Sequence, residues 1–212
     1  MKLVDLSVKD FLNIVDSKSP APGGGSVSAL VSALGCTLGR MVAHLTFDKK
    51  KFKEIPEWEQ ESFKAAFEEI DSYRKTLEGL IDRDTEAYNL VMAGYKLPKD
   101  TEEEREIRKL TIEKNLKLAI ETPLEICKIS EKTLKSLKII LKYGNKNAIT
   151  DLGVSAILLY SGIEGGVLNV KINLGGIDDE AFKMETLNQL ERILFISKEI
   201  KDEILSVVNE CL

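Results

Sequence analysis

The sequence contains little histidine and cysteine, and each scarcity excludes some kinds of catalytic or metal site. The one histidine is His44, and the three cysteines, Cys36, Cys127 and Cys211, are far apart and form no Cys-x-x-Cys pair. A zinc site of several histidines or a catalytic triad would have to be built around His44 alone. A disulfide framework is equally disfavoured, so we expect a protein of the reducing cytoplasm with no bound metal.

The chain also lacks an excess of positive charge. The 212 residues include 30 Lys and Arg against 35 Asp and Glu, which gives a net charge of −5. A nucleic-acid-binding protein normally carries a net basic surface, so we expect no nucleic-acid partner. The N-terminus has no hydrophobic signal region, and the uncharged run Ser26–Gly39 is too short and too rich in Ser and Gly to span a bilayer. We therefore expect no membrane partner and a cytoplasmic location.

The abundant residue types favour helices, and capping residues and breakers mark where the helices begin and end. Only 5 residues are proline and 6% are aromatic, whereas Leu, Ile, Lys and Glu are abundant. Capping residues and breakers predict a short helix opened by Ser7 and four longer ones: after the Gly-rich turn at 22–26, from Pro56 to about Tyr95, from a Thr101–Glu104 capping box to Tyr143, and over 178–210.

In the segment 151–176 the spacing of apolar residues does not decide between helix and strand, because LNVKINL at 168–174 alternates like a strand. No partner strand is recognisable elsewhere, and a lone strand cannot satisfy its backbone hydrogen-bonding groups. We therefore interpret this segment as helix. The sequence then predicts one all-α domain over 1–212, a bundle of long antiparallel helices.

Asp84 is the residue that periodicity singles out. A helical wheel places it in the middle of an apolar stripe formed by Ile70, Tyr73, Leu77, Ile81, Tyr88, Val91 and Tyr95. Burial there would raise the pKa of the carboxyl and let it act as a general acid or base. A structural carboxylate bound to a backbone donor or a lysine is the alternative.

The turn PGGGS at 22–26 precedes a helix N-terminus, where free backbone N–H groups favour an anion. It matches neither the P-loop nor the dinucleotide fingerprint, and a flexible turn between tightly packed helices explains it more simply. The basic run Lys49, Lys50, Lys51 and Lys53 is either a solvated loop or an attractor for an anionic tail.

Amide side chains gather in two places. Asn145, Asn147 and Asp151 surround an expected helix start, where capping alone explains such residues. Asn169 and Asn173 are four residues apart and share one face of an otherwise apolar segment. Because buried amides cost more than leucine, this second pair indicates a ligand or a subunit contact.

These motifs together resemble a known family. The blocks SPAPGGGSVSAL, MVAHLTFDKKKF, DRDTEAYNLVMAGYKLP, GNKNAITDLGVSA and LNVKINL occur here in the order found in the cyclodeaminase/cyclohydrolase family. This family comprises the C-terminal half of formiminotransferase-cyclodeaminase and free-standing bacterial relatives. The resemblance covers the chain from about Phe11 to Leu174, beyond which the helical tail is less specific.

The resemblance implies an all-α homodimer or a dimer of dimers, with folate in a cleft between helices near or across the subunit interface. It implies closure of 5-formimino-tetrahydrofolate to 5,10-methenyl-tetrahydrofolate with release of ammonia. The second activity it implies is methenyl-tetrahydrofolate cyclohydrolase, which opens the 5,10-methenyl to the 10-formyl compound. No cofactor beyond the tetrahydrofolate substrate is expected. A non-catalytic helical dimer scaffold is the third hypothesis.

The resemblance also suggests roles for residues, with His44 outside the family pattern. Asp84 falls on the proposed catalytic acid or base of the family, although it could instead pair with the pterin, and Asp151 is its rival in either role. Asn145, Asn169 and Asn173 would orient the pterin or a transient oxyanion. The candidates for binding the glutamate tail are the turn residues Gly23, Gly24, Gly25 and Ser26 and the pair Lys49 and Lys50.

Overall fold

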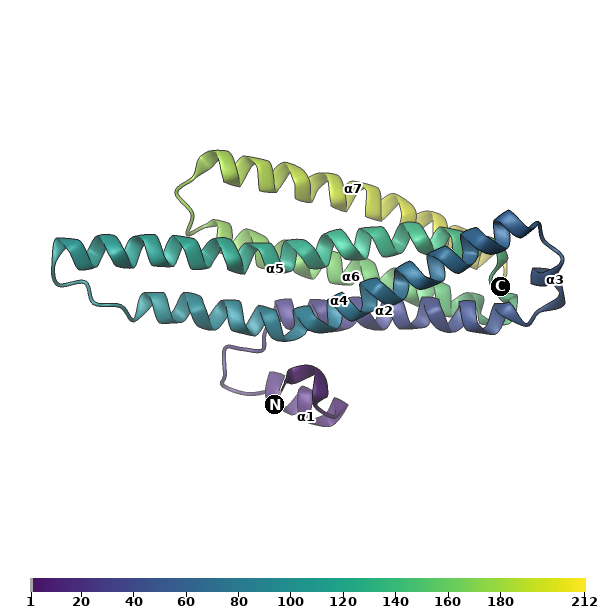
Figure 1. Cartoon of the computed structure of the whole chain (residues 1–212), viewed down its shortest axis with the longest axis horizontal. Helices are drawn as coiled ribbons and strands as arrows, with labels where there is room; N and C mark the ends of the chain where they lie inside the picture. The colour runs from purple at the N-terminus through teal and green to yellow at the C-terminus, as the bar shows by residue number, and fades with distance from the viewer. Residues whose placement is uncertain (1) are drawn as a thin grey trace.

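The computed structural model describes residues 2–212, and all its regular structure is helical (Figure 1). Among these residues there is no strand, which confirms the predicted all-α class. The α-helices are α1 (Val8–Val15), α2 (Gly24–Phe47), α3 (Lys50–Lys53), α4 (Glu57–Tyr95), α5 (Glu102–Tyr143), α6 (Ile149–Leu174) and α7 (Glu180–Glu210), with 3-10 turns η1 (Leu3–Asp5) and η2 (Lys146–Ala148).

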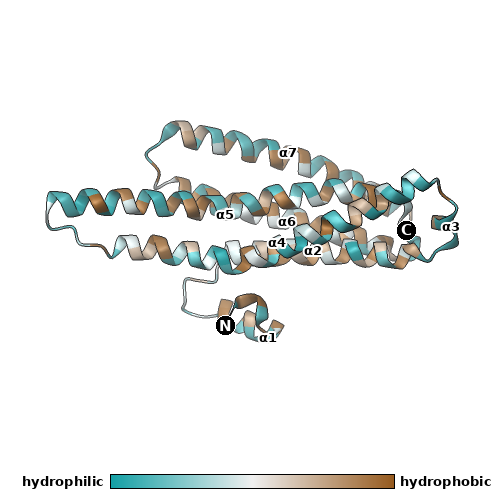
Figure 2. Cartoon of the chain, in the orientation of Figure 1, coloured by the Kyte–Doolittle hydropathy of each residue, from teal (hydrophilic) through white to brown (hydrophobic). Residues whose placement is uncertain are grey.

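The long helices lie alongside one another, and α2 packs against α4, α5 and α6. Small residues allow α2 this close packing, because a Cβ on Gly35 would lie only 2.8 Å from Leu159 Cγ of α6. Gly39 of α2 likewise leaves room for Leu137 of α5. Helix α7 covers α5 and α6, and Figure 2 shows hydrophobic and hydrophilic residues alternating along both α5 and α7. Each is therefore amphipathic.

Capping residues set the helix boundaries, as the sequence predicts. Ser7 Oγ accepts a hydrogen bond from Asp10 N at 3.1 Å. Thr101 and Glu104 form a reciprocal capping box at the start of α5, and Gly144 is the C-cap of that helix. The basic run, expected to separate two helices, itself forms the one-turn helix α3.

The ambiguous segment is helical, which confirms its interpretation. Val167, Val170 and Leu174 recur at helical spacing and are buried. The strand-like alternation comes from Leu168 and Ile172, which are apolar but 69% and 76% exposed. Outward apolar residues, and not a second buried face, produce the alternation.

Two segments, Gly24–Phe47 and Lys146–Leu174, are long and apolar enough to cross a membrane by length and composition. The first extends beyond the Ser26–Gly39 run on which the sequence argument relied. Both pack inside the bundle, with 56% and 50% of their most apolar stretches buried. Core helices of bundles meet the same criterion, so these two are weak grounds for a membrane assignment.

Candidate functional site

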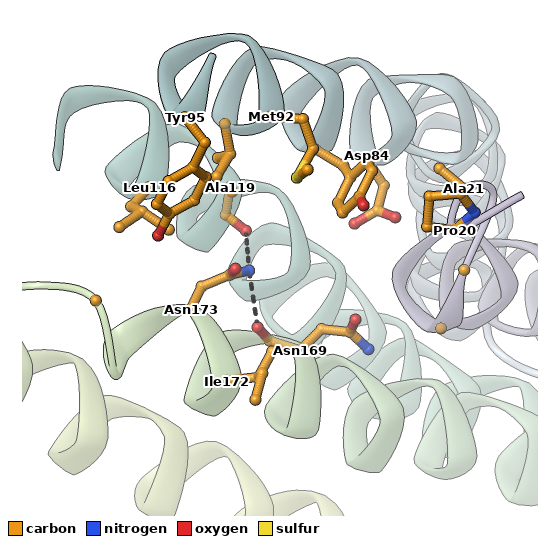
Figure 3. A pocket seen from close by; sticks show the side chains of 15 residues that line it. Pro20, Ala21, Asp84, Met92, Tyr95, Leu116, Ala119, Asn169, Ile172 and Asn173 are labelled. Carbon is orange, nitrogen blue, oxygen red and sulfur yellow. Dashed lines mark hydrogen bonds between the residues drawn. The ribbon is translucent and has the colours of Figure 1, made fainter. Parts of the chain in front are cut away.

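A cavity of about 400 Å³ opens where the C-terminal half of α4 faces α5, the C-terminal half of α6 and the segment leading into α2 (Figure 3). Its walls combine apolar side chains such as Met92 and Ile172 with a few polar groups: Asp84, Asn169, Asn173 and two tyrosines. Pro20, Ala21, Gly23 and Gly24 close one side. An apolar cleft with a few convergent polar groups is typical of a small-molecule site.

The stripe on α4 explains how Asp84 reaches this cavity. Its first part is core, because Ile70, Leu77 and Ile81 are each at most 1% exposed. Beyond Asp84 the same stripe continues with Tyr88 and other residues that line the cavity. One helix face thus passes from the core into the site, and Asp84 lies at the transition.

The first turn of α2 meets the carboxylate of Asp84. Ser26 N donates to Asp84 Oδ2 at 2.9 Å, and Ser26 Oγ lies 3.2 Å from the same oxygen. Ser26 Oγ also donates to the Ile81 carbonyl at 2.7 Å. Gly25 leaves the space that Asp84 Oδ1 occupies, since a Cβ there would overlap it. The glycine turn therefore places a helix N-terminus against a carboxylate, where the positive end of the helix dipole favours negative charge.

Opposing effects act on the proton affinity of this carboxyl. Burial raises the pKa of Asp84 above its ordinary value, while the hydrogen bonds from Ser26 lower it, and burial has the larger effect. The direction agrees with the desolvation that the helical wheel predicts. A half-buried carboxyl of raised pKa beside an open cavity can exchange a proton with a ligand.

The paired amides of α6 lie on the opposite wall (Figure 3). Asn173 Nδ2 donates to the carbonyls of Ala119 at 3.1 Å and Asn169 at 3.0 Å. Asn169 Nδ2 donates to the Gly165 carbonyl at 2.8 Å. Both side chains line the cavity, as their shared helix face predicts. Asp84 and these amides offer a flat heterocycle hydrogen-bonding groups between apolar walls.

Four of the predicted site residues lie elsewhere in this chain. Asn145 accepts from Asn147 N as the cap of η2, and its own N–H donates to Thr46 Oγ1 at 2.9 Å, at the opposite end of α2. Asp151 lies in the first turn of α6, eighteen residues or about 27 Å from Asn169. Lys49 and Lys50 also lie beyond the far end of α2, at α3. One chain alone does not bring these four to the cavity.

Some lining residues gave no signal in the sequence. Leu116 and Ala119 of α5 contribute an ordinary apolar patch that only the packing of α5 against α4 and α6 brings to the cavity. Tyr88 and Tyr95 were recognisable only as members of the α4 stripe. Pro20 and Ala21 directly precede the Gly-rich turn at 22–26, but nothing in their residue type indicates a ligand.

A family model described as formiminotransferase-cyclodeaminase matches residues 7–192. The chain is 36% identical over 203 residues to a methenyltetrahydrofolate cyclohydrolase of Methylorubrum extorquens, covering 96% of each protein. It is 33% identical over 208 residues to a formimidoyltransferase-cyclodeaminase of Gallus gallus, covering 98% of this chain but only 38% of the relative.

A solved structure has the same fold over nearly the full length. The crystal structure of a formiminotetrahydrofolate cyclodeaminase from Thermotoga maritima superposes with a TM-score of 0.86 and 28% sequence identity. The match covers 99% of this chain and 98% of that one. Free-standing chains of this length therefore include one named a cyclohydrolase and one named a cyclodeaminase.

Proposed function

This chain belongs to the formiminotransferase-cyclodeaminase family, and we propose that it is a folate one-carbon enzyme that closes 5-formimino-tetrahydrofolate to 5,10-methenyl-tetrahydrofolate with release of ammonia. The observation that carries this proposal is Asp84, a carboxyl of raised pKa that faces the cavity. The cavity is large enough for a pterin, and its apolar walls suit an aromatic heterocycle.

The chemistry needs one well-placed proton donor. The folate nitrogen attacks the formimino carbon to form a tetrahedral intermediate whose carbon carries three nitrogens, and this intermediate must then expel ammonia. Because the nucleophile belongs to the same molecule, orientation within the cavity supplies much of the acceleration. The nitrogen leaves only when it is protonated, and a neutral carboxylic acid at Asp84 is a suitable donor. Asp84 afterwards regains a proton from solvent or from the cyclising nitrogen.

Methenyl-tetrahydrofolate cyclohydrolase is the second candidate, and the full-length match to the Methylorubrum extorquens protein favours it. In that reaction ionised Asp84 would take a proton from water as the water attacks the methenyl carbon. The same position of the carboxyl serves both reactions, because both act on the carbon that bridges two folate nitrogens.

A single assay separates these functions. Purified protein is offered each substrate while ammonia and the ultraviolet absorbance of the methenyl compound are followed. Ammonia release with methenyl formation supports the cyclodeaminase, and loss of methenyl absorbance above the uncatalysed rate supports the cyclohydrolase. No turnover of either substrate would leave the non-catalytic scaffold as the function.

We also propose that the chain acts as a homodimer, because one face of α2 lacks a partner among residues 2–212. Its stripe has the heptad spacing of a helix seam and consists of Val27, Val31, Leu34, Leu38, Met41 and Leu45. Leu34 and Leu45 are 49% and 47% exposed, and the other four are partly buried. A second copy is the natural occupant, since a two-fold axis pairs like surfaces.

A two-fold axis near the middle of this stripe would run the two α2 helices antiparallel. The Gly24 end of one copy would then approach the Phe47 end of the other, where Lys49, Lys50 and Asn145 lie. Asp151, at the start of α6, lies toward the same end of the bundle. The second copy would thereby supply the four predicted residues that one chain keeps away from its own cavity.

The reaction and the composition of the chain also bear on its cofactors, location and partners. The reaction needs no cofactor beyond the tetrahydrofolate substrate, because the side chains and water supply the proton transfers. We place the enzyme in the cytoplasm, without a nucleic-acid or membrane partner, on the grounds of its acidic composition and free cysteines. Assembly into a dimer of dimers would leave this arrangement of the site unchanged.

A further inference from the structure

Pro123 lies near the middle of α5, yet the helix continues without interruption from Glu102 to Tyr143. Proline has no backbone N–H, so the carbonyl four residues earlier loses the donor that an ordinary helix would supply. That carbonyl belongs to Ala119, which lines the cavity. A buried carbonyl without a donor is costly, and a donor from another element must satisfy it.

Asn173 supplies this donor from α6. Its Nδ2 lies 3.1 Å from the Ala119 carbonyl and 3.0 Å from the carbonyl of Asn169 (Figure 3). A side-chain amide has two N–H donors and one oxygen acceptor. Both donors of Asn173 are thus directed to backbone carbonyls, one on each helix, and the oxygen Oδ1 is left for the cavity.

Close packing of α5 and α6 allows this reach. A Cβ on Gly166 would lie 3.0 Å from the Pro123 carbonyl and 2.6 Å from Cys127 Sγ, so glycine is required where the two helices meet. The bond to Asn169 lies within α6, so by itself it would not fix the direction of the amide relative to α5. The second bond, to Ala119, fixes the direction of the amide relative to α5.

We propose that Pro123 is a positioning residue: by freeing the Ala119 carbonyl it locks the Asn173 amide with Oδ1 facing the cavity as an acceptor. This inference deepens the proposed function, because Asn173 then accepts a hydrogen bond from an N–H edge of the ligand. Asp84 across the cavity is a second acceptor when ionised. Bound heterocycles that present N–H donors to this wall are favoured over those that present carbonyl oxygens.

Replacing Pro123 by alanine tests the proposal. In Pro123→Ala the new N–H competes for the Ala119 carbonyl, and the Asn173 amide loses one of its two partners. We expect the dissociation constant of tetrahydrofolate and the KM to rise about fivefold, the effect of one ordinary hydrogen bond, with kcat changed less than about twofold. The matched control is Thr122→Ala, the adjacent buried residue, whose hydroxyl donates within α5 to Leu118 O at 3.4 Å and should leave both constants unchanged.

A double-mutant cycle distinguishes positioning from packing. Because Pro123 acts through Asn173, Pro123→Ala should have no further effect on tetrahydrofolate binding in an Asn173→Ala background. An equal rise in both backgrounds would overturn the proposal. A Pro123→Ala protein that binds tetrahydrofolate as tightly as the wild type would overturn it as well.

The hydrogen exchange of the Asn173 side-chain amide, followed by NMR and assigned through its loss in Asn173→Ala, needs neither a folded Pro123 variant nor activity. Slow exchange of both amide hydrogens in the ligand-free wild type is the expected result, and rapid exchange would contradict the proposed bonds. Failure of wild-type protein to bind tetrahydrofolate would count against the proposed function, while this measurement still tests the positioning.

Discussion

The properties of Asp84 arise from two segments that are far apart in the chain. Its own helix carries it to the edge of the core, and the first turn of α2, fifty-eight residues away, supplies the N–H group that contacts it. The sequence predicted a desolvated carboxylate from the stripe on α4. It did not predict the contact with Ser26, because no local pattern specifies which helix N-terminus packs over which face.

The variant Gly25→Ala tests the contact between the first turn of α2 and the carboxylate of Asp84. The added Cβ would occupy the position of Asp84 Oδ1 and displace the carboxylate, so we expect turnover to fall at least about tenfold, as for a misplaced catalytic group. Gly79→Ala is the matched control, because nothing lies within 4 Å of the new Cβ. That control should keep full activity and gain about 1 kcal/mol in helix stability. Equal activity of the two variants would show that Gly25 does not position Asp84.

The raised pKa of Asp84 also predicts how stability depends on pH. Since burial favours the protonated form in the folded state, the unfolded chain releases this proton at lower pH than the folded protein does. Asp84 therefore costs no stability below its unfolded pKa, and the cost develops as pH rises through the higher folded pKa. Asp84→Asn, which stays uncharged, should gain in melting temperature relative to wild type as pH is raised from 4 to 8. Calorimetry that shows the opposite trend would mean a lowered pKa.

At the scale of the helix, the signals that a sequence carries locally were sufficient. The capping box at Thr101 and the end of α5 at Tyr143 agree with the prediction. The role of Pro123 was not predictable, because it depends on Asn173 reaching across from another helix. Contacts between elements depend on packing, which the period of one segment does not specify.

The packing of α6 on α2 leads to a prediction about helical glycines. A Cβ on Gly162 would overlap Ser32 Oγ and lie 3.0 Å from the Ser28 carbonyl, so Gly162→Ala should destabilise the fold by about 1–3 kcal/mol. A Cβ on Gly153, on the same helix, would lie 3.4 Å from Val208 Cγ1. Alanine there should be neutral or stabilising by up to about 1 kcal/mol. Urea unfolding of both variants measures the difference, and equal stabilities would contradict close packing at Gly162.

At the scale of the whole molecule, the candidate residues divide between the two ends of the bundle. Gly23, Gly24, Asn169 and Asn173 line the cavity beside Asp84. The block from Asn145 to Asp151 and the Lys49–Lys50 pair lie at the other end. Sequence motifs indicate the candidate residues of a site, but they do not state which copy of the chain provides them.

The proposed dimer makes a sharp prediction about mixed assemblies. If each site combines Asp84 of one copy with Asp151 of the other, Asp84→Asn and Asp151→Asn homodimers should both be inactive. Co-expression would then form heterodimers in which one site has both native aspartates, and activity should return to about a quarter of wild type. Sedimentation velocity checks that the mixture is dimeric. Dimers that regain no activity would show that each site lies within one chain.

The central claim is that Asp84 transfers the proton in the reacting complex, and the kcat of Asp84→Asn tests it most directly. On the substrate that the wild type converts, we expect kcat to fall at least about a hundredfold with KM nearly unchanged. The control is Asp82→Asn, two residues away, whose carboxylate accepts from Leu3 N at 2.6 Å and should leave kcat unchanged. An Asp84→Asn enzyme with native kcat and a raised KM would contradict the claim and make Asp84 a pterin anchor.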